Sequence, residues 1–186
     1  VTAGQSLPYL HLTARVMRER GIVLEPLPDR VGWTVTGGQT YRGGAFDLEP
    51  DWSAAAFWVV AGCLSGPVCL NGLQENSPQG DRFIWDLAQE AGAILERPAP
   101  GQWVIRRGSP RPFEADLSQT PDLFPPAAIL AAGASGTSRL RGTHRLRAKE
   151  SDRAQGLVEL LTRLGIEARD ENDTLTILGK GRLEGG

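Results

Sequence analysis

The stretch GPVCLNG at residues 66–72 recurs as GTSRLRG at residues 136–142, roughly 70 positions further along the chain. A second matching pair follows each copy: Asp81-Arg82 after the first and Asp152-Arg153 after the second. Self-similarity at a fixed spacing is typical of structures built from repeated supersecondary units. The repeat is therefore the feature from which the fold is predicted.

The first copy predicts the element order β-α-β-α-β-β. Ser53–Leu64 is rich in alanine and apolar on all sides, which is typical of a buried helix. Asp81–Ala91 has apolar side chains at helical spacing, and Gly92 follows as a helix terminator. Short runs with strand character lie at Ala45–Glu49, Pro67–Asn71, Ala93–Glu96 and Trp103–Arg106.

The second copy predicts the same order from Phe113 onward. Pro125–Ala132 reads as a helix with prolines in its first turn, where their missing N–H groups cost little. Ser151–Leu164 reads as a helix with a leucine stripe, ended by Gly165. Strands are predicted at Phe113–Leu117, Thr137–Arg141, Ile166–Arg169 and Leu175–Leu178. Together the copies indicate an α/β (α+β) fold.

The first 38 residues have the pattern of the tail of a third copy. A helix over Pro8–Arg20, ended by Gly21, is followed by strands at Ile22–Glu25 and Trp33–Thr36. A repeat that starts in mid-unit indicates a chain cut from something longer. The alternative is an irregular helix and hairpin that cap two complete repeats.

Composition excludes several classes of protein. The 186 residues have a formal net charge of −2 and a pI near 5.8, so no overall positive field attracts nucleic acid or an anionic membrane. The longest apolar run, within Ala54–Leu64, is too short to span a bilayer. Val1–Tyr9 lacks the pattern of a signal peptide. We expect a cytoplasmic protein that binds neither nucleic acid nor membrane.

Cysteine and histidine usage predicts neither a disulfide nor a metal site. Cys63 and Cys69 lie in apolar surroundings and are expected to be buried, reduced thiols. His11 and His144 are far apart in the sequence and have no cysteine near them. We expect no metal and no cofactor.

The densest polar cluster lies at residues 139–153, between a predicted strand and a predicted helix. A helix N-terminus favours a phosphate or carboxylate, and helical spacing would place Lys149 and Arg153 on one face. Glu150 lies between these cations and is suited to proton exchange beside an anionic substrate. The alternative is a solvated charged loop with a capping residue at Ser151.

Three further places carry polar residues next to predicted helices. Asp122 precedes the Pro125–Ala132 helix, as Asp51 precedes its counterpart in the first copy, and an N-cap is the simplest explanation. Ser6 precedes a proline-initiated helix and is also a candidate cap. Residues 76–81 occupy the loop equivalent to 149–152 but carry no basic side chain, which favours a structural role.

These segments resemble the EPSP synthase family. LRAKESDR at residues 146–153 is similar to the family's Arg-x-Lys-Glu-[Ser/Thr]-Asp-Arg motif, and Pro121-Asp122 with Pro125 is similar to its Pro-Asp motif. Further similar segments are SLPY (6–9), GGQTY (37–41), EPDWS (49–53) and NSPQGD (76–81). The resemblance covers nearly the whole chain but less than half of a family enzyme. It implies an inside-out α/β barrel fold with buried helices and sheets outside, truncated here. Residues 1–49 would end the first domain, and 50–186 would form most of the second.

The resemblance also implies a reaction, in which the enolpyruvyl group of phosphoenolpyruvate moves to the 5-hydroxyl of shikimate 3-phosphate. Asp122 would hold and help deprotonate the hydroxyl, and Lys149 would bind substrate and share the proton transfer. Glu150 would protonate the methylene carbon of phosphoenolpyruvate. Arg153 would bind phosphoenolpyruvate, and Ser6 and Tyr9 would contact shikimate 3-phosphate.

Two departures from the family pattern affect these expectations. Arg145 stands where some members have a substrate-contacting Asn, and the chain stops at Gly186, before the family's Asp-His-Arg segment. The first-domain substrate ligands are absent too, so we expect little turnover without the complementary part of the enzyme. The alternatives are a non-catalytic fragment or binding module of the same fold, or a UDP-N-acetylglucosamine enolpyruvyltransferase.

Overall fold

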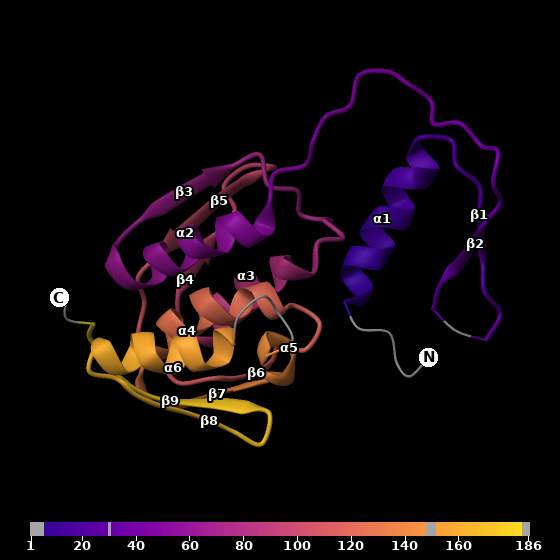
Figure 1. Cartoon of the computed structure of the whole chain (residues 1–186). Coiled ribbons are helices and arrows are strands. Elements are labelled where there is room, and N and C mark those ends of the chain that lie inside the picture. Colours follow the sequence, from indigo (N-terminus) through magenta and orange to yellow (C-terminus); the bar gives the residue numbers. More distant parts are fainter. Residues whose placement is uncertain (1–5, 30, 148–151, 184–186) are drawn as a thin grey trace.

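The computed structural model describes residues 6–29, 31–147 and 152–183. Its ribbon has two parts, joined by residues 36–51, which carry neither helix nor strand (Figure 1). The N-terminal unit contains one helix and one hairpin, whereas the main unit, residues 52–183, contains both sequence copies. Among the described residues, no helix combines the length and the apolar character needed to cross a bilayer.

The N-terminal unit folds around a small apolar core. Helix α1 (Leu7–Glu19) ends before Gly21, whose φ of 83° is the left-handed conformation that glycine adopts without strain. Strands β1 (Leu24–Pro26) and β2 (Trp33–Val35) form an antiparallel pair. Ala14, Ile22 and Leu24 are buried, with Met17 and Trp33 packed against them. The predicted helix and hairpin are confirmed.

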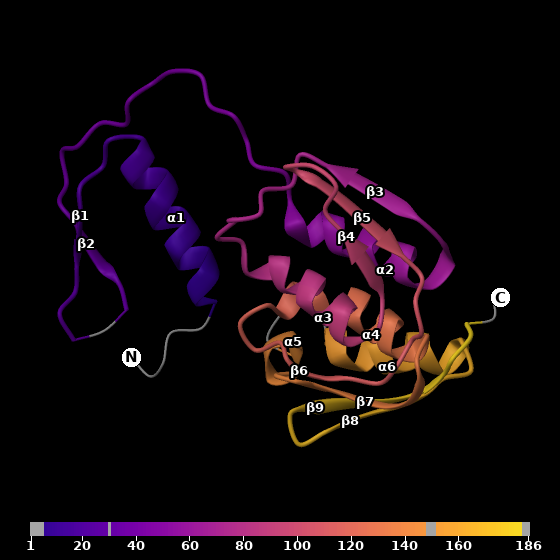
Figure 2. The same ribbon diagram turned by 180° about the vertical axis from the view of Figure 1, so that it is seen from behind.

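The main unit has two sheets with helices between them, as the views in Figures 1 and 2 both show. The first copy gives an antiparallel sheet of order β3-β5-β4, made of β3 (Val68–Asn71), β4 (Ile94–Glu96) and β5 (Gln102–Arg106). The second copy gives a sheet of order β6-β7-β9-β8, made of β6 (Glu114–Asp116), β7 (Ser135–Arg141), β8 (Glu167–Glu171) and β9 (Thr174–Lys180). Strands β6 and β7 are parallel, and the remaining neighbours are antiparallel.

Helices fill the space between the sheets. They are α2 (Trp52–Ser65), α3 (Ile84–Glu90), α4 (Phe124–Ala132), α5 (His144–Arg147) and α6 (Arg153–Arg163), with 3-10 turns η1 (Gly80–Phe83) and η2 (Pro121–Leu123) before α3 and α4. Helix α2 lies so close to the first sheet that a Cβ on Gly62 would come within 2.8 Å of Ile105. The prediction of buried helices with sheets outside is confirmed.

The core of the first copy contains three tryptophans in edge-to-face contact. The Trp103 ring centroid lies 5.0 Å from that of Trp52 and 4.6 Å from that of Trp85. Such T-shaped pairs add to the stabilisation that comes from burying large aromatic surfaces. The indole nitrogen of Trp103 also donates to the carbonyl oxygen of Leu73 at 2.9 Å, so this buried polar atom is satisfied.

The strand predicted at Ala45–Glu49 is wrong. This segment forms no strand and pairs with none among the described residues; a hydrogen bond of 3.5 Å joins the Arg20 side chain to the Ala45 carbonyl. An alternating pattern forms a strand only where a neighbouring backbone supplies hydrogen-bond partners. The first sheet consequently lacks a counterpart of β6, which pairs with β7 in the second sheet.

The prediction that both cysteines are buried is half right. Cys63 and Cys69 are free thiols, and Cys63 is buried in α2, where desolvation raises its pKa to about 12. Cys69 is exposed, because it lies on the outer face of β3. With its raised pKa, the Cys63 thiol stays protonated and chemically inert at neutral pH.

Candidate active site

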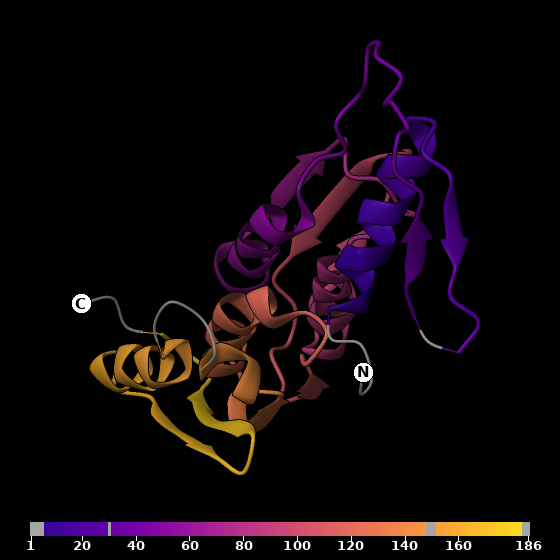
Figure 3. The same ribbon diagram turned by 45° about the vertical axis from the view of Figure 1, so that its right-hand side comes forward.

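The start of α1 lies beside the main unit (Figure 3), and hydrogen bonds from Leu7, Tyr9 and Ser6 join the two. The Leu7 amide donates to Oε1 of Gln119 at 3.0 Å, and the Tyr9 hydroxyl donates to Oδ1 of Asp81 at 2.9 Å. Arg145 donates from Nη2 to Oγ of Ser6 at 2.6 Å. Residues separated by as many as 139 sequence positions therefore meet where the two units touch.

Ser6 does not cap α1, contrary to the alternative drawn from its position. Its backbone is left-handed, with φ 57° and ψ 41°, and its side chain makes no capping hydrogen bond. The hydroxyl oxygen instead accepts the bond from Arg145. A non-glycine residue in this conformation persists only where its surroundings hold it, and such residues concentrate at ligand sites.

Asp122 lies inside the 3-10 turn η2, and the capping role is wrong for it as well. Neither η2 nor α4 receives a side-chain cap, whereas Asp51 does cap α2 by accepting from the Ser53 amide at 2.8 Å. Arg153 places Nη1 3.4 Å from Oδ1 of Asp122, and both side chains are partly exposed. The structure thus brings together two predicted site residues, one from the turn η2 and one from the start of α6.

Lys149 and Glu150 lie outside the described residues, so their assigned roles stay predictions. The ends of their segment are defined by α5, which closes at Arg147, and by α6, which begins at Arg153. Asp152 caps α6 by accepting from the Gln155 amide at 3.1 Å. The cap is thus Asp152 and not Ser151.

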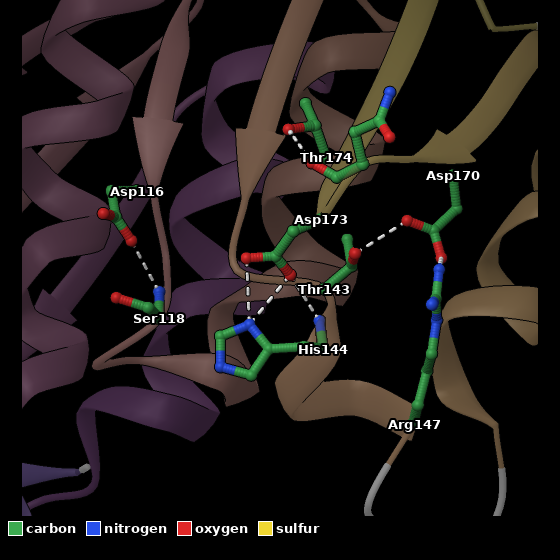
Figure 4. Close-up of polar contacts among 9 residues, drawn as sticks. Asp116, Ser118, Thr143, His144, Arg147, Asp170, Asp173 and Thr174 are labelled. Carbon is green, nitrogen blue, oxygen red and sulfur yellow. Dashed lines mark hydrogen bonds and ion pairs between the residues drawn. The ribbon is translucent and has the colours of Figure 1, made fainter. Parts of the chain in front are cut away.

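Two aspartates of the β8–β9 hairpin support the described part of this basic loop (Figure 4). Asp173 accepts from the His144 amide at 2.6 Å and contacts the Nδ1 of its ring at 2.8 Å. Asp170 accepts from the Thr143 hydroxyl at 2.7 Å and from Nη2 of Arg147 at 2.6 Å. Partial burial opposes the charged form of Asp173, but the bonds from His144 outweigh it and lower the pKa of that carboxyl.

Sequence reasoning missed this support and also missed α5, since residues 144–147 were expected to form a loop. The available signal was the Asn172-Asp173 pair between two predicted strands. Both residues have positive φ, at 49° and 61°, as a tight hairpin turn requires. The turn fixes which carboxylates face His144 and Arg147, and so it orients the start of the basic loop.

The described residues of this site are suited to binding anions. Arg145 and Arg153 each present a guanidinium beside a partner from another loop, and guanidinium groups match phosphate and carboxylate geometry. The described ranges contain no group of three metal-ligating side chains. The arrangement can hold anionic substrates, with Asp122 as a carboxylate for proton transfer.

An apolar groove lies away from these residues. It has a volume of about 480 Å³ between α2 and α4 and is lined by apolar side chains such as Phe57, Leu64 and Ile129. None of the predicted site residues lines it. Its apolar character indicates an open packing surface of the two helices, while the polar residues of the site gather near the first turn of α1.

Comparisons with known proteins agree with this architecture. A family model described as EPSP synthase (3-phosphoshikimate 1-carboxyvinyltransferase) matches residues 1–186. The 3-phosphoshikimate 1-carboxyvinyltransferase of Methanocorpusculum labreanum is 35% identical over 180 residues, which cover 97% of this chain and 42% of the relative. That of Aeropyrum pernix is 44% identical over 136 residues, covering 73% and 32%.

Solved structures show the same relationship. EPSP synthase from Acinetobacter baumannii superposes with a TM-score of 0.74 at 26% identity, covering 91% of this chain and 40% of that one. The enolpyruvyl transferase NikO from Streptomyces tendae has a TM-score of 0.67 at 21% identity, a likeness of fold alone. The chain therefore spans less than half the length of these relatives. With the family model matching from end to end, the chain belongs to the EPSP synthase family.

Proposed function

We propose that the protein carrying this chain transfers the enolpyruvyl group of phosphoenolpyruvate to the 5-hydroxyl of shikimate 3-phosphate, with release of phosphate. The observation that supports this most is the meeting of the two units. Ser6 and Tyr9 of the N-terminal unit bond to Arg145 of α5 and to Asp81 of η1 in the main unit. Helix α5 leads along the chain to the segment that holds Lys149 and Glu150, and Asp81 lies close enough to Asp122 for that charge to raise the Asp81 pKa.

The proposed chemistry divides into addition and elimination. In the addition, Asp122, helped by Lys149, accepts the proton of the 5-hydroxyl as its oxygen bonds to C2 of phosphoenolpyruvate. Glu150 gives a proton to C3, so the methylene becomes a methyl group in a tetrahedral intermediate. In the elimination, Glu150 takes a proton back from the methyl group as the C2–O bond to phosphate breaks. The carbon–carbon double bond re-forms, and the two carboxylates recover their initial states once the proton taken from the 5-hydroxyl has left with phosphate.

Binding in this proposal depends on charge, since both substrates are anions. Arg153 binds phosphoenolpyruvate, and its contact with Asp122 keeps the guanidinium oriented before the substrate arrives. Ser6, Tyr9 and Lys149 contact shikimate 3-phosphate. A charge-assisted hydrogen bond contributes roughly 1.5–3 kcal/mol, so losing any one cation weakens binding measurably.

We further propose that residues 1–49 end one domain and residues 50–186 form most of the next, with the ligands bound between them. The relatives are more than twice as long as the matched segment. The remaining substrate contacts would come from the complementary part of the same enzyme, in the cytoplasm. By this proposal the 186-residue chain alone has negligible turnover.

Phosphate release tests the proposal directly. The complete protein would be given phosphoenolpyruvate with either shikimate 3-phosphate or UDP-N-acetylglucosamine, alongside the isolated chain and a Glu150→Gln variant. Release that needs shikimate 3-phosphate and is lost in the variant supports the proposal. Release with UDP-N-acetylglucosamine instead would reassign the acceptor, and silence of the complete protein with both acceptors would indicate a non-catalytic member of the fold.

A further inference from the structure

Asp81 is a buried carboxylate to which the proposed reaction assigns no role. It is 1% exposed and lies in the turn η1, yet it accepts hydrogen bonds from two hydroxyl groups of other elements. One is the Tyr9 hydroxyl on α1, at 2.9 Å from Oδ1, and the other is the Ser53 hydroxyl on α2, bonded to Oδ2. Three elements from both units therefore share a single carboxylate.

The packing around Asp81 leaves little space for α1 to shift. A Cβ built on Gly80 would lie 3.0 Å from Pro8 of α1 and 2.9 Å from the methyl carbon of Thr120. The Leu7 amide also donates to Gln119, the residue before Thr120, and so holds the same turn. The first turn of α1 thus packs closely against η1 and the loop before η2.

Burial disfavours the charged form of the Asp81 carboxylate. Burial raises the pKa of Asp81, the bonds from Ser53 and Tyr9 act in the opposite direction, and the nearby charges of Asp122 and Asp51 raise it further. Burial and the Asp81 charge likewise raise the pKa of the Tyr9 phenol, which therefore stays a hydrogen-bond donor. Burying a carboxylate costs free energy unless hydrogen-bond donors compensate it. Here Tyr9 and Ser53 are the two donors.

We propose that Asp81 is a positioning residue for the substrate site: by binding Tyr9 and Ser53 together, it fixes the first turn of α1, with Ser6 and Tyr9, against the main unit. Since Ser6 and Tyr9 are the proposed contacts of shikimate 3-phosphate, this inference rests on the proposed function. Asp81 does not touch the substrate. It acts through Tyr9, so its effect is expected in the binding of shikimate 3-phosphate.

The chemistry predicts a ranking of substitutions. In Asp81→Asn the amide oxygen still accepts from Tyr9, and the Ser53 hydroxyl can rotate to accept from the amide nitrogen. In Asp81→Ala both hydroxyls lose their acceptor and the Tyr9 hydroxyl is left without one in a half-buried place. The Asn variant should therefore keep the first turn of α1 fixed against the main unit, whereas the Ala variant should loosen it. Glu114→Gln is a matched control, since Glu114 also accepts from two donors, Arg139 and Arg141, but in an exposed position.

The first test needs no turnover. Hydrogen exchange would be measured on the 186-residue chain at the amides of Leu7, Tyr9 and Leu10, since Pro8 has no N–H, with the amides of β7 and β9 as internal references. We expect Asp81→Ala to speed exchange at residues 7–10 by about tenfold or more, because each tenfold step corresponds to about 1.4 kcal/mol, a typical loss for one buried hydrogen bond. Asp81→Asn and Glu114→Gln should stay within about threefold of the unaltered chain. Unchanged exchange at residues 7–10 in Asp81→Ala, with that protein folded, overturns the proposal.

The second test uses the complete protein and separates positioning from general stability. We expect Asp81→Ala to raise KM for shikimate 3-phosphate by about tenfold, with KM for phosphoenolpyruvate nearly unchanged and with recovery in Asp81→Asn. Adding Ser53→Ala to Asp81→Ala should have little further effect, because both remove the contact between Ser53 and the carboxylate. A lower melting temperature with unchanged KM, or KM effects of the two substitutions that simply multiply, would overturn the proposal. If the unaltered complete protein does not use shikimate 3-phosphate, the proposed function fails, and the exchange measurement still decides whether Asp81 seats α1.

Discussion

The loop PQGDR at residues 78–82 and the loop KESDR at residues 149–153 occupy equivalent places in the two copies, but they serve different ends. In the first, Gln79 accepts from the Trp52 amide at 2.8 Å and donates to the Pro50 carbonyl at 2.9 Å, and Asp81 is buried. In the second, Asp152 is an exposed helix cap, and Arg153 turns to Asp122. One copy uses the loop to hold the backbone together, while the other is proposed to bind substrates, so a shared fold does not dictate a shared function.

The largest expected effect comes from making the second loop resemble the first. Glu150→Gln places in the second copy the residue that the first copy has at position 79, and it removes the proposed proton donor. We expect turnover to fall by about 10²–10³-fold with little change in KM, since general acid–base catalysis contributes about 10²–10⁴-fold. Steady-state kinetics of the complete protein would measure this.

The reverse change, Gln79→Glu, is the control for that comparison. It removes the amide donor to Pro50 and should lower the melting temperature with little effect on turnover. Equal losses of turnover in Glu150→Gln and Gln79→Glu would contradict the proposal that residues 149–153 take part in catalysis while residues 78–82 have a structural role.

The second prediction compares the strand cores of the two copies. Leu140 is fully buried, whereas its counterpart Leu70 is only partly buried. We expect Leu140→Ala to lower the free energy of unfolding by about 2–5 kcal/mol, from lost burial and the remaining cavity, and Leu70→Ala to lower it by roughly half as much. Chemical denaturation followed by circular dichroism would test this, and equal costs at both positions would contradict the burial difference.

The third prediction concerns the two arginines of the loops. Arg153→Ala should raise KM for phosphoenolpyruvate by about 10–100-fold, because a charge-assisted hydrogen bond contributes roughly 1.5–3 kcal/mol. Arg82→Ala, at the equivalent position of the first copy, should change KM for phosphoenolpyruvate by no more than about twofold, since a surface charge outside the site contributes little to binding. A similar rise of KM in both variants would indicate that the loss of any positive charge, and not of a specific contact, weakens binding.

The smallest effect is a dependence of stability on pH. Because the folded chain raises the pKa of Asp81, the folded state binds more protons than the unfolded state just above the ordinary value of 3.8. This carboxylate's contribution to the free energy of unfolding therefore falls as pH rises through that range. Asp81→Asn should remove this fall, so the variant gains relative stability with rising pH.

Asp152→Asn, at the equivalent position, tests whether that slope is specific. Asn caps helices about as well as Asp, so stability should stay within about 0.5 kcal/mol at each pH. Denaturation curves at a series of pH values would show the difference. A parallel pH dependence in Asp81→Asn and in the unaltered chain would contradict the assigned cause.

The repeated pattern was sufficient to predict most of the fold. Helix α2 lies within a residue of its predicted bounds, because an apolar helix is set by its own composition. The strand at Ala45–Glu49 failed because a strand also needs a neighbour, which no local pattern reveals. At the candidate site, the motif singled out Arg153 and Asp122, which the structure places in contact. The contacts of Asp81, Asp170 and Asp173 could not be predicted, because each joins residues far apart in the sequence; only the turn at Asn172-Asp173 had a sequence signal.

The tryptophan cluster of the first copy has a practical consequence for following how this chain unfolds. All five tryptophans, Trp33, Trp52, Trp58, Trp85 and Trp103, precede the second copy, and so do both tyrosines. Intrinsic tryptophan emission therefore comes entirely from residues 33–103 and reports on residues 113–183 only through the core that the two copies share. A transition seen by far-ultraviolet dichroism but absent from the emission would belong to the second copy. The chain thus carries a built-in optical label that distinguishes its two halves without any added dye.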